Sequence, residues 1–132
     1  MEQLNAVKNL LLQYPLWGGQ ALQVDLNDGR PEGCILFPQG LRVLDRREDV
    51  QGNVTYRLEQ SFLLRRVAFA GENAAHWLQQ LQNWLLIQPA GALESVFGPK
   101  LRLWAELGRL TNAKQPGTGI YEVKIHAQYE KE

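Results

Sequence analysis

The 132-residue chain has little of what catalytic and metal-binding sites are usually built from. Its one cysteine, Cys34, excludes an internal disulfide and a cluster of thiolate metal ligands. Its two histidines, His76 and His126, lie in no metal-ligand motif, and the pattern around each predicts a solvated surface side chain. No nucleophile elbow, P-loop or dinucleotide-binding fingerprint occurs. The sequence therefore argues against an enzyme and predicts no catalytic, cofactor or metal site.

The chain also lacks an excess of charge of either sign and a long apolar run. Its 14 basic side chains balance its 14 acidic ones, so no global field attracts nucleic acid or anionic lipid. No apolar run approaches the roughly 20 residues of a membrane span. The first residues, MEQLNAVKNLLLQYP, have neither the basic region nor the small-residue cleavage site of a signal peptide. We therefore expect a protein made in the reducing cytoplasm, without membrane contacts or sequence-specific nucleic-acid binding.

Cys34 is the one residue with the chemistry of a strong nucleophile. Three apolar residues, Ile35-Leu36-Phe37, follow it directly, and this context predicts a small buried hydrophobic side chain. The enzymatic alternative requires His76 or His126 to lie within hydrogen-bond reach of the thiol, roughly 3 Å away.

What the sequence does have is a long region of regular patterning from Val54 to Ile87. Apolar residues alternate with polar ones in its first half, which predicts a strand with one buried face: Val54, Tyr56, Leu58, Phe62 and Leu64. After Arg65-Arg66 the apolar phase changes, which predicts a bulge or a strand tip that leaves the sheet face. From residue 74 to 87 the period becomes helical, with Asn73 as the expected N-cap and one apolar stripe: Ala74, Trp77, Leu78, Leu81, Trp84 and Leu85.

The remaining patterns complete one domain over residues 1–132. A helix is expected at 3–14, ended by Pro15, and strands at 21–26 and 41–46, with a short apolar run at 34–37 between them. A polar hairpin loop at 46–53 leads into the long strand. Strands at 101–107 and 120–129, joined by the loop 112–119, form an antiparallel hairpin. The order is helix, three or four strands, helix, two strands, which predicts an α+β fold with a mainly antiparallel, possibly mixed sheet covered by two helices on one face.

Two features have both a structural and a functional interpretation. The basic residues of the predicted hairpin are either a solvated face, balanced by Glu48, Asp49 and Glu59, or a protein interface: Arg42, Arg46, Arg47, Arg57, Arg65 and Arg66. Trp104 lies on the less apolar face of its strand, so it is either covered by a helix or exposed for a partner subunit. With four tryptophans, four tyrosines and no catalytic set, the chain is more typical of an assembly protein.

Several short phrases, in this order, carry a resemblance to a known family. They are Tyr14-Pro15-Leu16 before two glycines, Ile35-Leu36-Phe37-Pro38, Arg65-Arg66 near the end of the long strand, Gly71-Glu72 before the helix, Asn83-Trp84-Leu85, and the alternating strand Ile120 to Tyr129. From about residue 4 to 130 the chain resembles the minor capsid or tail terminator proteins of tailed phages and prophages.

The resemblance implies a virion structural protein at the head–tail junction. Such a protein forms a ring with copies of itself, and we expect six subunits in the ring. The ring caps the tail tube and offers a docking surface to the head–tail connector. The remaining alternative is a cytoplasmic α+β module without catalytic activity that binds a protein or a small apolar ligand. A pocket enclosed by Trp77, Trp84 and Trp104 would support that alternative.

Overall fold

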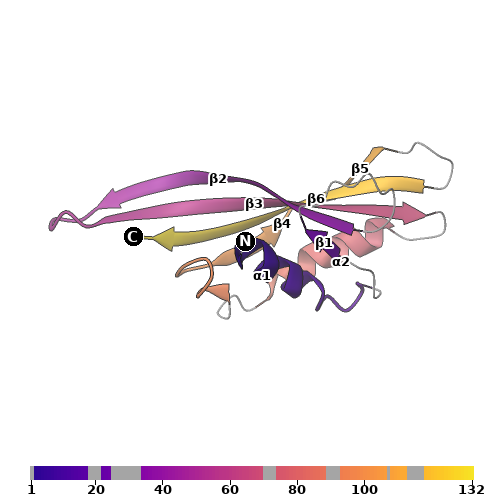
Figure 1. The fold of residues 1–132 in the computed structure, drawn as a ribbon, viewed down its shortest axis with the longest axis horizontal. Coiled ribbons are helices and arrows are strands. Elements are labelled where there is room, and N and C mark those ends of the chain that lie inside the picture. Colours follow the sequence, from indigo (N-terminus) through magenta and orange to yellow (C-terminus); the bar gives the residue numbers. More distant parts are fainter. Residues whose placement is uncertain are drawn as a thin grey trace.

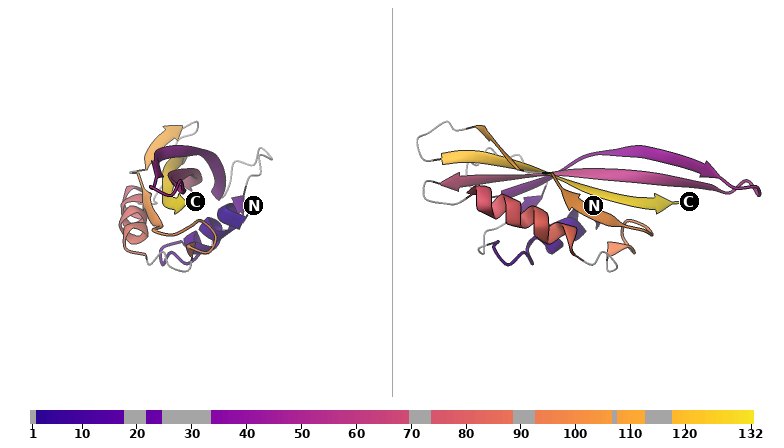
Figure 2. Two further views of the ribbon diagram at one scale, coloured as in Figure 1. Left: turned by 90° about the vertical axis from the view of Figure 1, so that its left-hand side faces the viewer. Right: turned by 180° about the vertical axis from the view of Figure 1, so that it is seen from behind.

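A computed structural model describes residues 2–17, 22–24, 34–69, 74–88, 93–106, 108–112 and 118–132. It confirms the expected α+β fold, with two helices packed against one face of a sheet (Figures 1 and 2). The expected N-cap Asn73 lies outside the described residues, as does Leu107, the last residue of the strand expected at 101–107.

The sheet has six described strands in the order β1-β2-β3-β6-β4, with β5 also paired to β6. They are β1 Leu22–Val24, β2 Cys34–Glu48, β3 Val54–Phe69, β4 Arg102–Ala105, β5 Arg109–Asn112 and β6 Thr118–Lys131. All neighbours are antiparallel except β1, which pairs parallel with the start of β2. The sheet is therefore mixed, and the expected antiparallel pairing of the last strand with the strand near residue 103 is confirmed.

Helix α1 spans Glu2–Leu11 and helix α2 spans Ala74–Leu86. The chain continues from α1 in two further turns to Trp17, so the helix ends three residues before the expected limit. The two helices are joined through Tyr14, whose hydroxyl donates to the carbonyl oxygen of Trp77 at 3.0 Å, and burial raises the pKa of this tyrosine. The rings of Trp77 and Trp84 both lie within 5.4 Å of the Tyr14 ring, centroid to centroid.

Period-two alternation separates the sheet into a core face and a polar face. On the core face, the predicted residues Leu58, Phe62 and Leu64 of β3 are buried together with the alternate residues of β6. On α2, the stripe residues Trp77, Leu78, Leu81 and Leu85 are buried against them, while Trp84 is partly buried. Cys34 also lies in this core, as expected, and is 1% exposed.

Strand β2 differs from its prediction because it runs without interruption through Pro38 and Gly40. Proline is tolerated there since this part of β2 pairs with β3 on one side only, so no ladder bond is lost on the other. The bulges fall in β2, between Pro38 and Gly40 and between Val43 and Asp45. The bulge or departing strand tip expected after Arg65-Arg66 is wrong in both forms, because β3 stays paired with β6, without a shift in register, as far as Phe69.

The hairpin of β2 and β3 forms a long arm that projects beyond the body of the domain (Figure 1). The first strand of the arm, β2, ends at Glu48, two residues beyond the expected limit at residue 46, so the connecting turn is only Asp49 to Asn53. Both oxygens of the Asp49 carboxylate accept hydrogen bonds, from the amides of Gln51 and Asn53 and from the Asn53 side chain. Strand β6 ends at Lys131, opposite Tyr56, and leaves the outer arm two-stranded.

Candidate assembly surface

The polar face of the sheet carries a row of interacting side chains across four strands. The register aligns Arg42 of β2, Glu59 of β3, Gln128 of β6 and Arg102 of β4. The Glu59 carboxylate is 5% exposed and accepts hydrogen bonds from Arg42 at 2.7 Å and from Gln128 at 3.2 Å. This buried charge is therefore compensated by hydrogen bonds, as a carboxylate out of water requires. The expectation that Glu59 is merely one of the solvated balancing charges is wrong.

The next row along the polar face contains His126, which was expected at the surface and is buried instead. Its ring stacks on the Trp104 ring at 5.1 Å, centroid to centroid, and its Nδ1 lies 3.2 Å from the Ser61 hydroxyl. Carboxylate oxygens of Glu59 and Glu106 lie 3.5 and 3.4 Å from its two ring nitrogens. The expectation failed because period two assigns His126 to the polar face correctly but does not show that Trp104 covers it.

The basic residues singled out by the sequence do not share one environment. Arg42, Arg57 and Arg65 lie on the polar face: Arg57 donates to Gln128 at 2.9 Å, and Arg65 lies over the Phe37 ring and 3.6 Å from Glu122. Near the end of the arm, Arg47 forms an ion pair with Asp45. Arg46 forms an ion pair with Glu48 and, being opposite Tyr56 in the register, lies on the other face of the sheet from Arg42, Arg57 and Arg65.

Arg66 does not belong to the surface set, so its inclusion there is wrong. It is 6% exposed, and its guanidinium lies 4.7 Å from the centroid of the Trp77 ring. Arg66 has the same parity as Leu64 and therefore faces the helices, where the aromatic face of Trp77 accommodates its charge.

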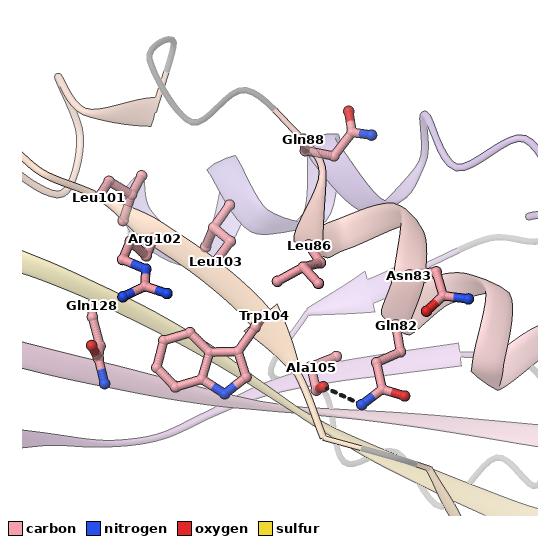
Figure 3. A pocket seen from close by; sticks show the side chains of 10 residues that line it. All are labelled: Gln82, Asn83, Leu86, Gln88, Leu101, Arg102, Leu103, Trp104, Ala105 and Gln128. Carbon is pink, nitrogen blue, oxygen red and sulfur yellow. Dashed lines mark hydrogen bonds between the residues drawn. The ribbon is translucent and has the colours of Figure 1, made fainter.

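Trp104 is partly buried and lines a groove of about 790 Å³ between β4 and the end of α2 (Figure 3). The groove contains the side chains of Gln82, Asn83, Leu86 and Gln88 from the helix side. Neither Trp77 nor Trp84 lines it, so the three-tryptophan pocket that would support a small apolar ligand does not form there. Trp104 stacks on His126 but stays partly accessible to solvent. It is therefore neither fully covered by a helix nor fully exposed for a partner subunit, the two alternatives that the sequence left open.

The groove follows an open edge of the sheet. Strand β4 pairs with β6 on one side only, and no other described strand pairs with its outer side. The carbonyl of Ala105 points outward, where the Gln82 side-chain amide donates to it at 3.0 Å (Figure 3). The amide of Glu106 donates inward, to the carbonyl of Lys124. Because backbone groups alternate in direction along a strand, the N–H and C=O groups of Leu103 point outward from the edge like those of Ala105.

No protein-family model matches this chain, and no curated protein matches it significantly. The candidate surface is therefore defined by the geometry of the described residues alone. Within the described part of the chain, no group of three or more His, Cys, Asp or Glu residues is placed to hold a metal ion. Neither described helix is long and apolar enough to cross a membrane.

The opposite edge of the sheet is also open along most of its length. Among the described strands, β1 covers only Cys34 to Leu36 of β2, and nothing pairs with the outer side beyond that point. This edge carries two exposed aliphatic side chains, Leu41 and Val43, which are 57% and 58% exposed. Long open edges with exposed aliphatic residues are sites for pairing with another chain. Sequence patterning alone missed both edges, because it does not order strands within a sheet.

Proposed function

We propose that the protein is a tail terminator of a tailed phage or prophage, a virion structural protein at the head–tail junction. In this role, copies of the chain close into a ring, expected to be a hexamer, which caps the tail tube and docks to the head–tail connector. The ring is assembled in the bacterial host cytoplasm. The role requires neither catalysis nor a cofactor, and it places no demand on Cys34, which lies in the core, or on His126, on the other face of the sheet.

The observation that carries the proposal is a pair of edges, at opposite sides of one sheet, with which no other described strand pairs. A head-to-tail ring needs two different surfaces on each subunit, one for each neighbour, and a closed ring leaves neither exposed. The β2 edge and the β4 edge meet this requirement. The resemblance of the sequence phrases to tail terminators supplies the biological setting for such a ring.

The proposal is tested in two steps. The first is the solution mass of the purified chain, by light scattering over a concentration series, in which we expect a climb toward a closed oligomer. The second adds the chain to polymerising tail-tube protein encoded by the same genome and measures tube length by electron microscopy. We expect shorter, capped tubes, because the ring occupies the growing face. Tubes of unchanged length, with no ring at their ends, would refute the proposed function.

A further inference from the structure

We infer that the two open edges bind each other directly, with the β2 edge of one copy filling the groove between β4 and α2 of the next copy. The inference rests on the proposed function for its biological setting, and it deepens that function by naming the two surfaces and the register of the contact. It commits to one occupant of the groove, a second copy of this chain.

Strand direction permits this contact in a ring. From β2 through β3 and β6 to β4 every pairing is antiparallel, so β4 runs opposite to β2. Rotation about an axis that runs along the strands leaves strand directions unchanged. The β4 edge of one copy therefore meets the β2 edge of the next as an antiparallel neighbour, continuing the pattern within the chain.

Backbone alternation fixes which residues pair. On β4, Leu103 and Ala105 direct their backbone groups outward, as the hydrogen bonds of Ala105 and Glu106 require. The same alternation continues from β4 across β6 and β3 to β2. On β2, the backbone groups of Gly40 and Arg42 therefore point toward β3, and those of Leu41 and Val43 point outward from the edge. Between the two β2 bulges, one antiparallel register joins both outward residues of each strand: Leu103 opposite Val43 and Ala105 opposite Leu41.

This register also matches the side chains on the core side. Leu41 and Val43 share a face with Leu58, the core face of the sheet, but in the arm they extend past the helices and stay exposed. In the groove they would lie beside Leu103 and Leu86, the second of which is 66% exposed. Exposed aliphatic side chains from both copies are thus removed from water together.

The polar side of the register is complementary in charge. Arg42 of one copy falls opposite Trp104 of the next, and Glu106 follows Trp104 by two residues, on the same face of the strand. The Arg42 side chain is 70% exposed although one of its nitrogens contacts Glu59, and Glu106 is 57% exposed. A guanidinium over an indole face beside a carboxylate is a favourable arrangement. The register shifted by one residue pair, with Leu103 opposite Leu41, would instead place Arg42 against Arg102.

Gln82 occupies the edge in the single chain. Its amide donates to the Ala105 carbonyl, which in the paired state accepts from the incoming Leu41 amide instead. The side chain is therefore a replaceable cover for the edge, and Gln82→Ala is expected to assemble at least as well as the wild type.

The test uses one charge on each surface, followed by a mixture. Val43→Glu alters the arm edge and Leu86→Glu alters the groove; both positions are exposed, so folding is expected to be retained and is checked by circular dichroism. Each variant alone is expected to lose at least about tenfold in self-association, since the contact would bury an unpaired carboxylate. Val50→Glu, at the fully exposed arm turn, is the matched control and is expected to assemble normally.

The mixture of the two variants gives the decisive result. The Leu86→Glu copy keeps an intact arm and the Val43→Glu copy keeps an intact groove, so exactly one productive contact remains. We expect a heterodimer and nothing larger by light scattering. A mixture that stays monomeric while the wild type associates would overturn the inference, as would normal assembly of either variant, or a wild type that stays monomeric up to about 1 mM.

The register has its own readout. In a Cys34→Ala background, Arg42→Cys and Trp104→Cys chains mixed under oxidation are expected to form a disulfide-linked heterodimer, because directly opposed non-hydrogen-bonded residues lie close enough for one. Arg42→Cys mixed with Arg102→Cys is not expected to do so, and preferential cross-linking of that pair would overturn the register.

Failure of the inference and failure of the proposed function give different results. A heterodimer from the two variants, together with wild-type rings that leave tube length unchanged, would uphold the contact and refute the terminator role. Capped, shortened tubes formed equally well by Val43→Glu or Leu86→Glu would uphold the role and refute the contact.

Discussion

At the scale of single residues, the Glu59 carboxylate joins side chains from the three central strands of the polar face. Replacing it with alanine leaves the partly buried Gln128 amide without its acceptor and removes the buried ion-pair partner of the exposed Arg42. We expect Glu59→Ala to lower the free energy of unfolding by about 1–3 kcal/mol, measured by urea denaturation. Glu48→Ala removes an exposed carboxylate 3.6 Å from Arg46 and is expected to cost less than about 1 kcal/mol. Equal losses would contradict the buried role of Glu59.

Gly98 marks a close approach of two backbone segments. A Cβ placed there would collide with the carbonyl oxygen of Glu130, which is backbone and cannot rotate away, and would also press on the Tyr129 ring. We expect Gly98→Ala to cost about 1–3 kcal/mol of stability, measured by thermal and urea unfolding.

Gly40 is the matched control for this prediction. Its φ of 151° is close to the 156° of Gly98, but a Cβ added there would meet nothing within 4 Å. The two alanine variants therefore share their backbone cost and differ in the collision alone. A loss for Gly40→Ala as large as that for Gly98→Ala would show that conformation, rather than contact, governs both positions.

At the scale of elements, α2 has a buried side and a side that lines the groove. Leu81 is fully buried, so Leu81→Ala is expected to cost about 2–5 kcal/mol of stability. Leu86 is exposed in the same helix, so Leu86→Ala is expected to leave urea unfolding nearly unchanged while weakening self-association. A large stability loss for Leu86→Ala would contradict the assignment of this side of the helix to assembly.

The turn of the arm is an element whose stability depends on pH. Hydrogen bonds from Asn53 hold the pKa of Asp49 below its ordinary value, and bonds from Gln51 and Gly52 add to the effect. A lowered pKa means that the carboxylate stabilises the folded turn above the ordinary value of about 3.9 and that this contribution is lost as the pH falls through the lowered pKa.

We therefore expect a carboxyl titration midpoint for Asp49 below about 3.9 by NMR. We also expect Asp49→Ala to speed hydrogen exchange at the amides that the carboxylate binds, while the melting temperature of the domain stays unchanged. Unchanged exchange at the Asn53 amide would show that the strands hold the turn without this side chain.

At the scale of the whole molecule, the arm and the body contribute to different properties. The core residues lie in the body, and beyond Lys131 of β6 the arm is two exposed strands and a turn. A variant with residues 47–55 replaced by Asn-Gly keeps Leu41 to Val43 and a favoured two-residue hairpin turn. We expect it to melt at the temperature of the full chain and to self-associate equally well. Loss of association would assign the contact to the tip of the arm instead of the β2 edge.

The amount of structure that the sequence could predict varies along the chain. Both helices and most strands follow from apolar periodicity, since burial of one face imposes a period of 3.6 or 2 on the residues themselves. Strand β5 was missed because its four residues are too short for a period to be visible. The unbroken course of β2 was missed because Pro38 and Gly40 disfavour a strand locally, while the long pairing with β3 outweighs them.

The candidate surface was predicted only in part, for a related reason. Arg42, Arg57, Arg65 and Trp104 do share the polar face, as period two implies. The burial of Arg66, Glu59 and His126 depends on partners that are distant in the chain: Trp77 lies 11 residues from Arg66, and Gln128 lies 69 from Glu59. The pattern of neighbouring residues does not show which residues from distant parts of the chain come into contact.

The sequence by itself determined the fold class and, for most helices and strands, which side faces the core. Only the tertiary structure decided which strands lie at the edges and which residues lie beside Trp104. It alone placed an exposed aliphatic strand at one edge and a groove at the other. The physical reason is that strand order is set by pairing between residues far apart in the chain, and the free backbone groups of an edge exist only once that order is fixed.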